Sequence, residues 1–412
     1  MALYETQLYR SIRTALDQVR IIDCHEHLQR DAELSQPDQA HIGRFFLHYA
    51  NCDLVSAGMP PADMAKVLDG SNGMDAQSRW ELLKPWYRLA WNTAYCEAVR
   101  IALRDLYGVE DLTDDTVELL TQRMADALKS GYTRQVFDRA GIDYALTNPF
   151  GPHPVYNGGF AADCFIVDMV DEFTHFPIQR LEAATGMDVS CLDDYLQVID
   201  WYFDRYAHMA SAFKVGRAYD RTLFWADVQA LEDYILHYLV RKCGEYNLRM
   251  KFHTGLQEGN GNLITNSRAA LMANLFMKYP KTQFDIYHIS YPYHEELVTL
   301  CKNFPNVTID FCWMWIINPA AGRRALSDML DAVPANKIHG FGGDYIFVEG
   351  TYAHAAMARR EIARVLADKV EEGRFDEDYA VTVGHMLLRD NPIRNFGLKA
   401  RRKAYLEACR KE

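Results

Sequence analysis

The stretch VRIIDCHEH (residues 19–27) joins a short apolar run to polar residues at its carboxyl end. The same pattern recurs at IDYALTN (142–148), DCFIVDMV (163–170), SAFKVGRAY (211–219), RMKFHTGL (249–256), QFDIYHIS (283–290), NVTIDFCWM (306–314) and KIHGFGGDY (337–345). Amphipathic segments with helical spacing separate the later runs. Strands that alternate with helices predict βαβ units and a parallel sheet. Eight such units predict an α/β fold of the (β/α)8 barrel type, with the active site at the carboxyl ends of the strands.

Residues 28–141, between the first and second predicted strands, form far too long a segment for an ordinary strand-to-helix loop. They contain two helical patterns, SRWELLKPWYRLAWNTAYCEAVRIALRDLYG (78–108) and TDDTVELLTQRMADALKSG (113–131). We therefore expect a helical insertion after strand 1 that caps the barrel mouth, within a single domain of residues 1–412. An independent helical domain is the alternative interpretation.

The composition is typical of a soluble protein with a large core. Of the 412 residues, 49% are hydrophobic and 24% are charged, and the formal net charge is −12. This acidic balance, without a basic stripe, argues against nucleic-acid binding. The sequence contains no run of about 18 apolar residues, which is the length that a membrane-spanning helix needs. Because the start lacks a signal-peptide pattern and the nine cysteines show no paired spacing, we expect a cytoplasmic protein with reduced thiols.

Potential metal ligands fall at the ends of five predicted strands. They are His25 and His27 on the first strand, Lys214 on the fourth, His253 on the fifth, His288 on the sixth and Asp344 on the eighth. Residues two apart on a strand point to the same face, and the carboxyl ends of barrel strands share one rim. Imidazole and carboxylate ligands suit zinc, and also iron, manganese or nickel. The pattern predicts a divalent metal site, with zinc as the expected ion.

The sequence resembles the amidohydrolase superfamily, the metal-dependent hydrolases of TIM-barrel fold. The matching motifs are DCHEHL (23–28), KFHTGL (251–256), YHISYPY (287–293) and GGDY (342–345). The similarity is greatest to the branch that holds uronate isomerase, decarboxylases related to aminocarboxymuconate semialdehyde decarboxylase, and amidohydrolase-like domains fused to glutamine-synthetase-like proteins. Two longer stretches support that branch, HTGLQEGNGNLITNSR (253–268) and LLRDNPIRNFGL (387–398).

The resemblance implies a role for each ligand. His25, His27 and Asp344 would hold the first metal. In members with one metal, His253 would complete or border that site, and His288 would orient water or polarise the substrate. In members with two metals, a carboxylated Lys214 would bridge them, and His253 and His288 would hold the second. No diagnostic motif surrounds Lys214, so we expect one metal per chain.

The expected reaction is hydrolysis by a metal-activated water at a carbonyl centre, with cleavage of a C–N or C–O bond in a small polar or acidic molecule. Asp344 is the candidate for proton transfer, His288 the candidate for stabilising oxyanion charge, and His253 their neighbour in the catalytic set. One alternative is a non-hydrolytic member of the superfamily, a uronate-type isomerase or a decarboxylase. Another is a catalytically silent ligand-binding barrel.

Candidate substrate contacts follow several strand ends. Arg217 and Arg268 would grip a carboxylate through two parallel hydrogen bonds, although solvated arginines fit the same positions. Trp313 and Tyr345 would wall the pocket, although aromatic residues in such runs more often pack in the core. Glu26 points away from His25 and His27, and we expect a structural role for it. The expected partner is a small molecule, and the apolar faces of the inserted helices are compatible with a homo-oligomer.

Overall fold

Eight parallel strands form the centre of the protein. The computed structural model describes residues 6–148, 160–226 and 230–411. The strand segments are β1 (Ile21–Glu26), β2 (Ile142–Thr147), β3 (Phe165–Val167), β4 (Met169–Val170), β5 (Phe213–Val215), β6 (Met250–Phe252), β7 (Phe284–Ile286), β8 (Val307–Asp310) and β9 (Ile338–His339). Because Asp168 alone separates β3 from β4, these two segments are the halves of one interrupted strand. Each predicted run contains its observed strand.

The strands pair in chain order and close on themselves. Each neighbouring pair from β1 to β3 and from β4 to β9 is parallel. The amide of Asp168 donates to the carbonyl of Thr147 (2.9 Å), which carries the ladder across the interruption. Beyond β9, Phe341 accepts a hydrogen bond from Cys24 (3.1 Å), and Asp344 donates one to His25 (2.8 Å). These contacts join the last strand to β1, and the expected TIM-barrel fold is confirmed.

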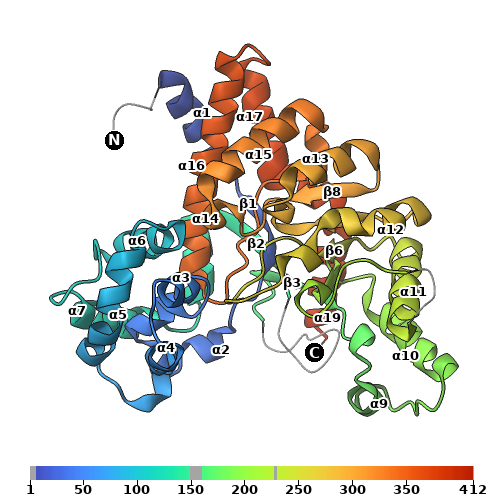
Figure 1. The fold of residues 1–412 in the computed structure, drawn as a ribbon, viewed down its shortest axis with the longest axis horizontal. Coiled ribbons are helices and arrows are strands. Elements are labelled where there is room, and N and C mark those ends of the chain that lie inside the picture. The colour runs from blue at the N-terminus through green and yellow to red at the C-terminus, as the bar shows by residue number, and fades with distance from the viewer. Residues whose placement is uncertain (1–5, 149–159, 227–229, 412) are drawn as a thin grey trace.

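Helices surround the barrel (Figure 1). The α-helices outside the segment between β1 and β2 are α1 (Gln7–Asp17), α9 (Ile178–Thr185), α10 (Leu192–Tyr206), α11 (Leu231–Glu245), α12 (Ala273–Lys278), α13 (His294–Asn303), α14 (Met314–Ile317), α15 (Pro319–Ala332), α16 (Val348–Glu371), α17 (Glu377–His385), α18 (Asn391–Asn395) and α19 (Leu398–Cys409). Short helical turns lie at η4 (Phe173–His175), η5 (Arg217–Tyr219), η6 (Ile264–Ser267), η7 (Ala269–Met272), η8 (Tyr287–Ser290), η9 (Ala335–Lys337) and η10 (Met386–Asp390).

The segment between β1 and β2 is helical, as its pattern predicts. It contains α2 (Asp31–Leu34), η1 (Pro37–Gln39), η2 (Ile42–Phe46), α3 (Ala50–Ser56), α4 (Pro61–Leu68), η3 (Gly70–Asn72), α5 (Ala76–Ala90), α6 (Ala94–Tyr107), α7 (Val117–Ala127) and α8 (Tyr132–Ala140). Helices α3 to α7 gather on one side of the barrel, whereas α8 packs against β2 and α16 (Figure 1). The Thr93 side chain caps α6 by accepting from the amide of Cys96 (3.3 Å). The division into a domain and a cap stays a prediction.

The barrel interior is buried along almost its whole length. Every residue of β1 and β5 to β9 is buried. This explains why the predicted strands read as continuous apolar runs rather than as alternating ones. In the described ranges, every helix is too short or too polar to cross a lipid bilayer.

Candidate metal centre

Four histidines and one aspartate meet at the carboxyl end of the barrel. The Nε2 atoms of His25 and His27 lie 3.4 and 3.5 Å from Oδ1 of Asp344. His288 Nε2 lies 3.8 Å from the other carboxylate oxygen of Asp344, and 3.0 Å from Nδ1 of His253. The structure therefore brings together the side chains that the sequence places at the ends of four strands.

Backbone carbonyl groups determine which ring nitrogens carry a proton. Nδ1 of His27 lies 2.7 Å from the carbonyl of Asn148, Nδ1 of His288 lies 3.0 Å from that of Cys312, and Nε2 of His253 lies 2.9 Å from that of Leu256. Because a carbonyl only accepts hydrogen bonds, each of these nitrogens is the donor. The other nitrogen of each neutral ring then presents a lone pair toward the centre of the cluster.

This arrangement fits a cation. Burial lowers the pKa of His27 and of His253 to about 3, with Lys214 adding to the effect, so both rings are neutral near pH 7. Lone pairs that face one another and a carboxylate repel unless a positive charge lies among them. Metal-bound histidines typically donate their second nitrogen to a carbonyl or carboxylate group, as these rings do. The donor set therefore suits a divalent metal held by His25, His27 and Asp344, beside His253 and His288.

Two residues of the cluster have an uncommon backbone conformation. Asp344 has a φ of 59° and His288 a φ of 58°, values in the left-handed region that residues other than glycine seldom adopt. The Tyr49 hydroxyl group donates to the carbonyl oxygen of Asp344 (2.5 Å), and the Asp344 amide donates to His25. Such conformations persist where surrounding contacts define them, and they concentrate at functional sites.

Lys214 lies beside the cluster without an acidic partner. Its Nζ atom is 3.2 Å from Nε2 of His25 and 4.1 Å from the centre of the Tyr287 ring. No carboxylate in the described part of the chain comes within 4 Å of Nζ, and burial lowers the pKa of this lysine. In contrast, the neighbouring Lys251 pairs with Asp168 at 2.9 Å. Carboxylation of Lys214 and its contact with substrate both stay predictions.

A cavity of about 290 Å³ opens over the cluster. Its lining residues are His27, His48, Tyr49, Asn148, Lys214, Gly216, Tyr219, His253, Glu258 and Asp344. The sequence did not single out His48, Tyr49, Asn148, Tyr219 or Glu258. His48, Tyr49 and Glu258 lie in the insertion and in a loop without regular spacing, whereas Asn148 and Tyr219 are the last residues of two predicted strand runs. The loop GLQEGNGN (255–262), which follows β6, contributes Glu258.

Comparison with known proteins agrees with this arrangement. Residues 205–398 match the family model described as amidohydrolase, and that range includes Lys214, His253, His288 and Asp344. Just under half of this chain therefore matches the amidohydrolase family. A 227-residue part of it is 27% identical to Protein fluG of Emericella nidulans, covering 52% of this chain and 24% of fluG. The matched part is thus a small fraction of that relative.

Solved structures share the fold of almost the whole chain. The glucuronate isomerase of Caulobacter crescentus is 16% identical, with 96% of both chains covered and a TM-score of 0.78. The uronate isomerase of Thermotoga maritima is 13% identical, with 96% of this chain and 98% of that chain covered and a TM-score of 0.75. At these identities the likeness shows a common fold.

Two acidic residues of β1 hold the segment that carries Asp344. Glu26 accepts hydrogen bonds from the Tyr345 amide (2.8 Å) and the Thr351 hydroxyl group (2.7 Å), and Asp23 accepts one from the Gly343 amide (3.0 Å). Burial raises the pKa of Asp23 to about 7, and burial with the adjacent Asp23 raises that of Glu26. Glu26 is outside the cavity lining, and both neighbours of Asp344 are tied to β1.

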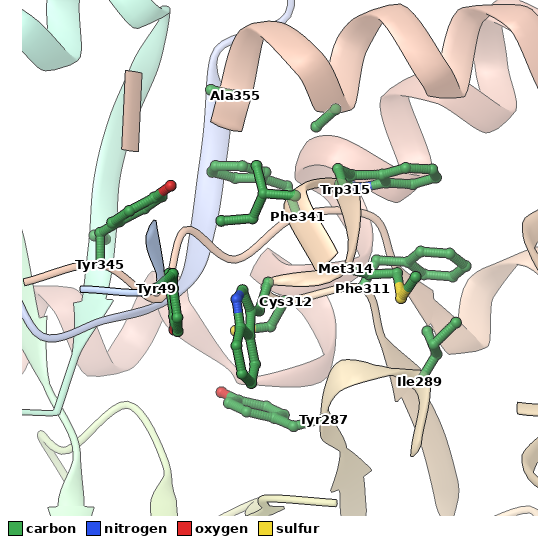
Figure 2. Close-up of a cluster of buried hydrophobic side chains, with 14 of the residues drawn as sticks. Tyr49, Tyr287, Ile289, Phe311, Cys312, Met314, Trp315, Phe341, Tyr345 and Ala355 are labelled. Carbon is green, nitrogen blue, oxygen red and sulfur yellow. The ribbon is translucent and has the colours of Figure 1, made fainter. Parts of the chain in front are cut away.

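The two aromatic residues predicted to line the pocket lie behind the residues that line the cavity. Trp313 is stacked on Tyr49 with ring centres 4.3 Å apart, and its indole approaches the His288 ring edge-on at 5.2 Å. Tyr345 meets Tyr49 edge-on at 5.3 Å, and Figure 2 shows Tyr49 between Tyr345 and Cys312. Both aromatic residues are almost completely buried. They support Tyr49, and a direct contact with substrate stays a prediction for each.

The two arginines predicted to bind substrate form ion pairs outside the cavity lining. Arg217 pairs with Glu232 and with Asp220 (3.1 Å), and Arg268 pairs with Glu296. Neither arginine lines the cavity. The structure therefore does not bring them to the metal ligands, and a role in gripping a substrate carboxylate stays a prediction for both.

Proposed function

We propose that this chain is a metal-dependent hydrolase that cleaves a C–N or C–O bond at a carbonyl centre of a small polar molecule. The observation that carries the proposal is the convergence of histidine lone pairs on Asp344 at the floor of a cavity. One zinc ion per chain is the proposed cofactor, because neutral imidazoles and a carboxylate are its usual ligands.

His25, His27 and Asp344 would hold the ion, with His253 and His288 beside it. A bound divalent ion supplies a Lewis acid for the carbonyl group and a lower pKa for water. Asp344 lines the cavity, so its carboxylate can accept the proton of the attacking water and return it to the leaving atom. The hydrogen bonds from Gly343 and Tyr345 to β1 hold that carboxylate in place.

His288 is proposed to orient the attacking water, whose O–H can donate a hydrogen bond to the lone pair on Nε2. Its Nδ1–H donates to Cys312, so Nε2 is directed toward Asp344 and His253. The ring is fully buried against Trp313, which restricts its rotation. Because contacts on both sides define the position of His288, the ring needs no rearrangement to accept a hydrogen bond from the attacking water.

A uronate-type isomerase or a decarboxylase is the second candidate. The fold shared with the glucuronate and uronate isomerases favours the isomerase. The cavity lining argues for the hydrolase, since no arginine is among its described residues to grip the carboxylate of a sugar acid. A silent ligand-binding barrel is the third reading, and the complete ligand set argues against it.

The test begins with metal analysis of protein purified without added metal or chelator. We expect about one equivalent of zinc per chain, lost in His25→Ala and Asp344→Asn. A panel of amides, lactones and uronic acids is then assayed in ¹⁸O-labelled water. Incorporation of the label into the acid product supports hydrolysis. If the chain instead turns over a uronic acid in a metal-dependent way, and water adds no label as a nucleophile, hydrolysis is overturned in favour of the isomerase. If no metal binds even after zinc is supplied, both proposals are contradicted.

A further inference from the structure

Among the described residues that line the cavity, one carboxylate is not a proposed metal ligand. It belongs to Glu258, in the loop that follows β6 and His253. The loop is held on both sides of this residue: the Glu258 amide donates to the Tyr219 hydroxyl group (3.1 Å), and the Asn262 side chain donates to the Glu258 carbonyl oxygen (2.7 Å). A third contact ties Asn260 to the carbonyl of Cys52 (3.2 Å), within the insertion. The backbone that carries the Glu258 side chain is therefore held in place.

Glu258 has no cationic partner in the described ranges. No lysine, arginine or histidine nitrogen there lies within 4 Å of its carboxylate, and its side-chain contact is the Cys52 thiol at 3.8 Å. The residue is half-buried, and this burial raises the pKa of the carboxyl group. A carboxylate partly removed from water without a partner is costly, and a cation placed beside it offsets that cost.

Among the described residues, some charged lining residues contact the histidine cluster, whereas the Glu258 carboxylate has no histidine nitrogen within 4 Å. Lys214 and Asp344 lie with the histidine cluster, and Glu258 is the further acidic residue of the lining. A carbonyl or carboxylate group suits the end with Lys214 and the metal ligands. A positive group suits the end with Glu258. The volume of about 290 Å³ is at the small end of the usual range for ligand pockets, so the ligand is a small metabolite.

We propose that Glu258 binds the ammonium group of the substrate, and that the substrate is a small carbonyl compound with a primary amine at the end remote from the scissile bond. This inference rests on the proposed function, since the metal end of the cavity receives the reacting carbonyl group. Glu258 is thus a specificity-determining residue. It selects amine-bearing substrates over acyl compounds of the same length.

Binding of unreactive probes tests this inference without turnover. The probes are 4-aminobutanoate, 5-aminopentanoate and 6-aminohexanoate, each compared by calorimetry with butanoate, pentanoate or hexanoate on the full chain. We expect at least one amino acid to bind about tenfold more tightly than its parent acid, as a hydrogen-bonded ion pair with Glu258 would give. In Glu258→Gln this preference should vanish while the affinity for the parent acid is kept. Glu245→Gln, an exposed substitution at the end of α11, is the matched control.

The outcomes separate this inference from the proposed function. A preference that survives in Glu258→Gln, or amino acids that bind no better than their parents or not at all, would overturn the role of Glu258. Metal content and ¹⁸O incorporation would still decide for or against hydrolysis in that case. Conversely, a preference that depends on Glu258 in a protein without hydrolytic activity would uphold this role and overturn the proposed reaction.

Discussion

The Nε2 atom of His288 lies 3.0 Å from the Nδ1 atom of His253, although the second nitrogen of each ring already donates to a backbone carbonyl. Two neutral rings in this arrangement point lone pairs at each other. The contact becomes favourable when a cation lies beside both nitrogens. The stability of the site therefore depends on the bound ion.

Removal of the ion is therefore expected to destabilise the folded protein. Treatment with a chelator should lower the melting temperature by a few degrees, and zinc should restore it, because a ligand that binds only the native state adds to the free energy of unfolding by an amount that grows with the logarithm of the ratio of free ligand concentration to Kd. The measurement is a thermal melt with and without chelator. His25→Ala with His27→Ala is the control, in which chelator should have no effect. Equal shifts in the control and the natural sequence would contradict the prediction.

Replacement of Lys214 tests the number of ions. Lys214→Met should leave about one equivalent of metal per chain, because the proposed ligands do not include this lysine. Its Nζ atom approaches His25 and the Tyr287 ring and no carboxylate of the described part. Metal analysis of the purified variant gives the answer. Two equivalents in the natural sequence, reduced by the substitution, would indicate a carboxylated lysine that bridges two metals.

A methyl group on Gly343 should displace Asp344. A Cβ atom there would lie 1.8 Å from Oε1 of Glu26, so Gly343→Ala must move either the Asp344 segment or Glu26. We expect a loss of about 1–3 kcal/mol of stability, typical of overpacking, together with reduced metal content. Gly216→Ala adds a methyl group in open space and is the control for stability. Full metal content and unchanged melting in Gly343→Ala would show that Glu26 does not position the ligand.

Tyr49 is expected to act on the metal site through Asp344. Tyr49→Phe removes the hydrogen bond to the Asp344 carbonyl and keeps the stacking on Trp313, so about 1–3 kcal/mol is lost from an unpaired buried acceptor. Tyr87→Phe removes a comparable hydrogen bond, to Asp111, within the inserted helices. Both variants should have a lower melting temperature. Only Tyr49→Phe should bind zinc more weakly in a competition titration. Equal zinc affinities would limit Tyr49 to a structural role.

Much of the fold followed from local pattern. Each buried strand produces a short apolar run, and the helices between them keep helical spacing, so the order of eight strands was readable before any contact was known. Convergence of His25, His27, His253, His288 and Asp344 was also predictable. Parallel barrel strands end at one rim, and a side chain at a strand's carboxyl end has nowhere else to lie.

Other features depend on segments that are distant in the chain. Arg217 and Arg268 follow strand ends as substrate-binding arginines would, yet ion pairs with Glu232 and Glu296 hold them outside the cavity lining. Which acidic group an arginine meets depends on how helices pack, and no local pattern encodes it. Glu26 similarly contacts Thr351, which is 325 residues away.

The sequence by itself determined the barrel, the order of its strands and the five side chains at its rim, because those properties follow from local periodicity and from the geometry of parallel strands. Only the tertiary structure decided that Tyr49 supports Asp344 and that Glu258 lines the cavity. Both residues come from segments without regular spacing, and their places are defined by contacts across the molecule.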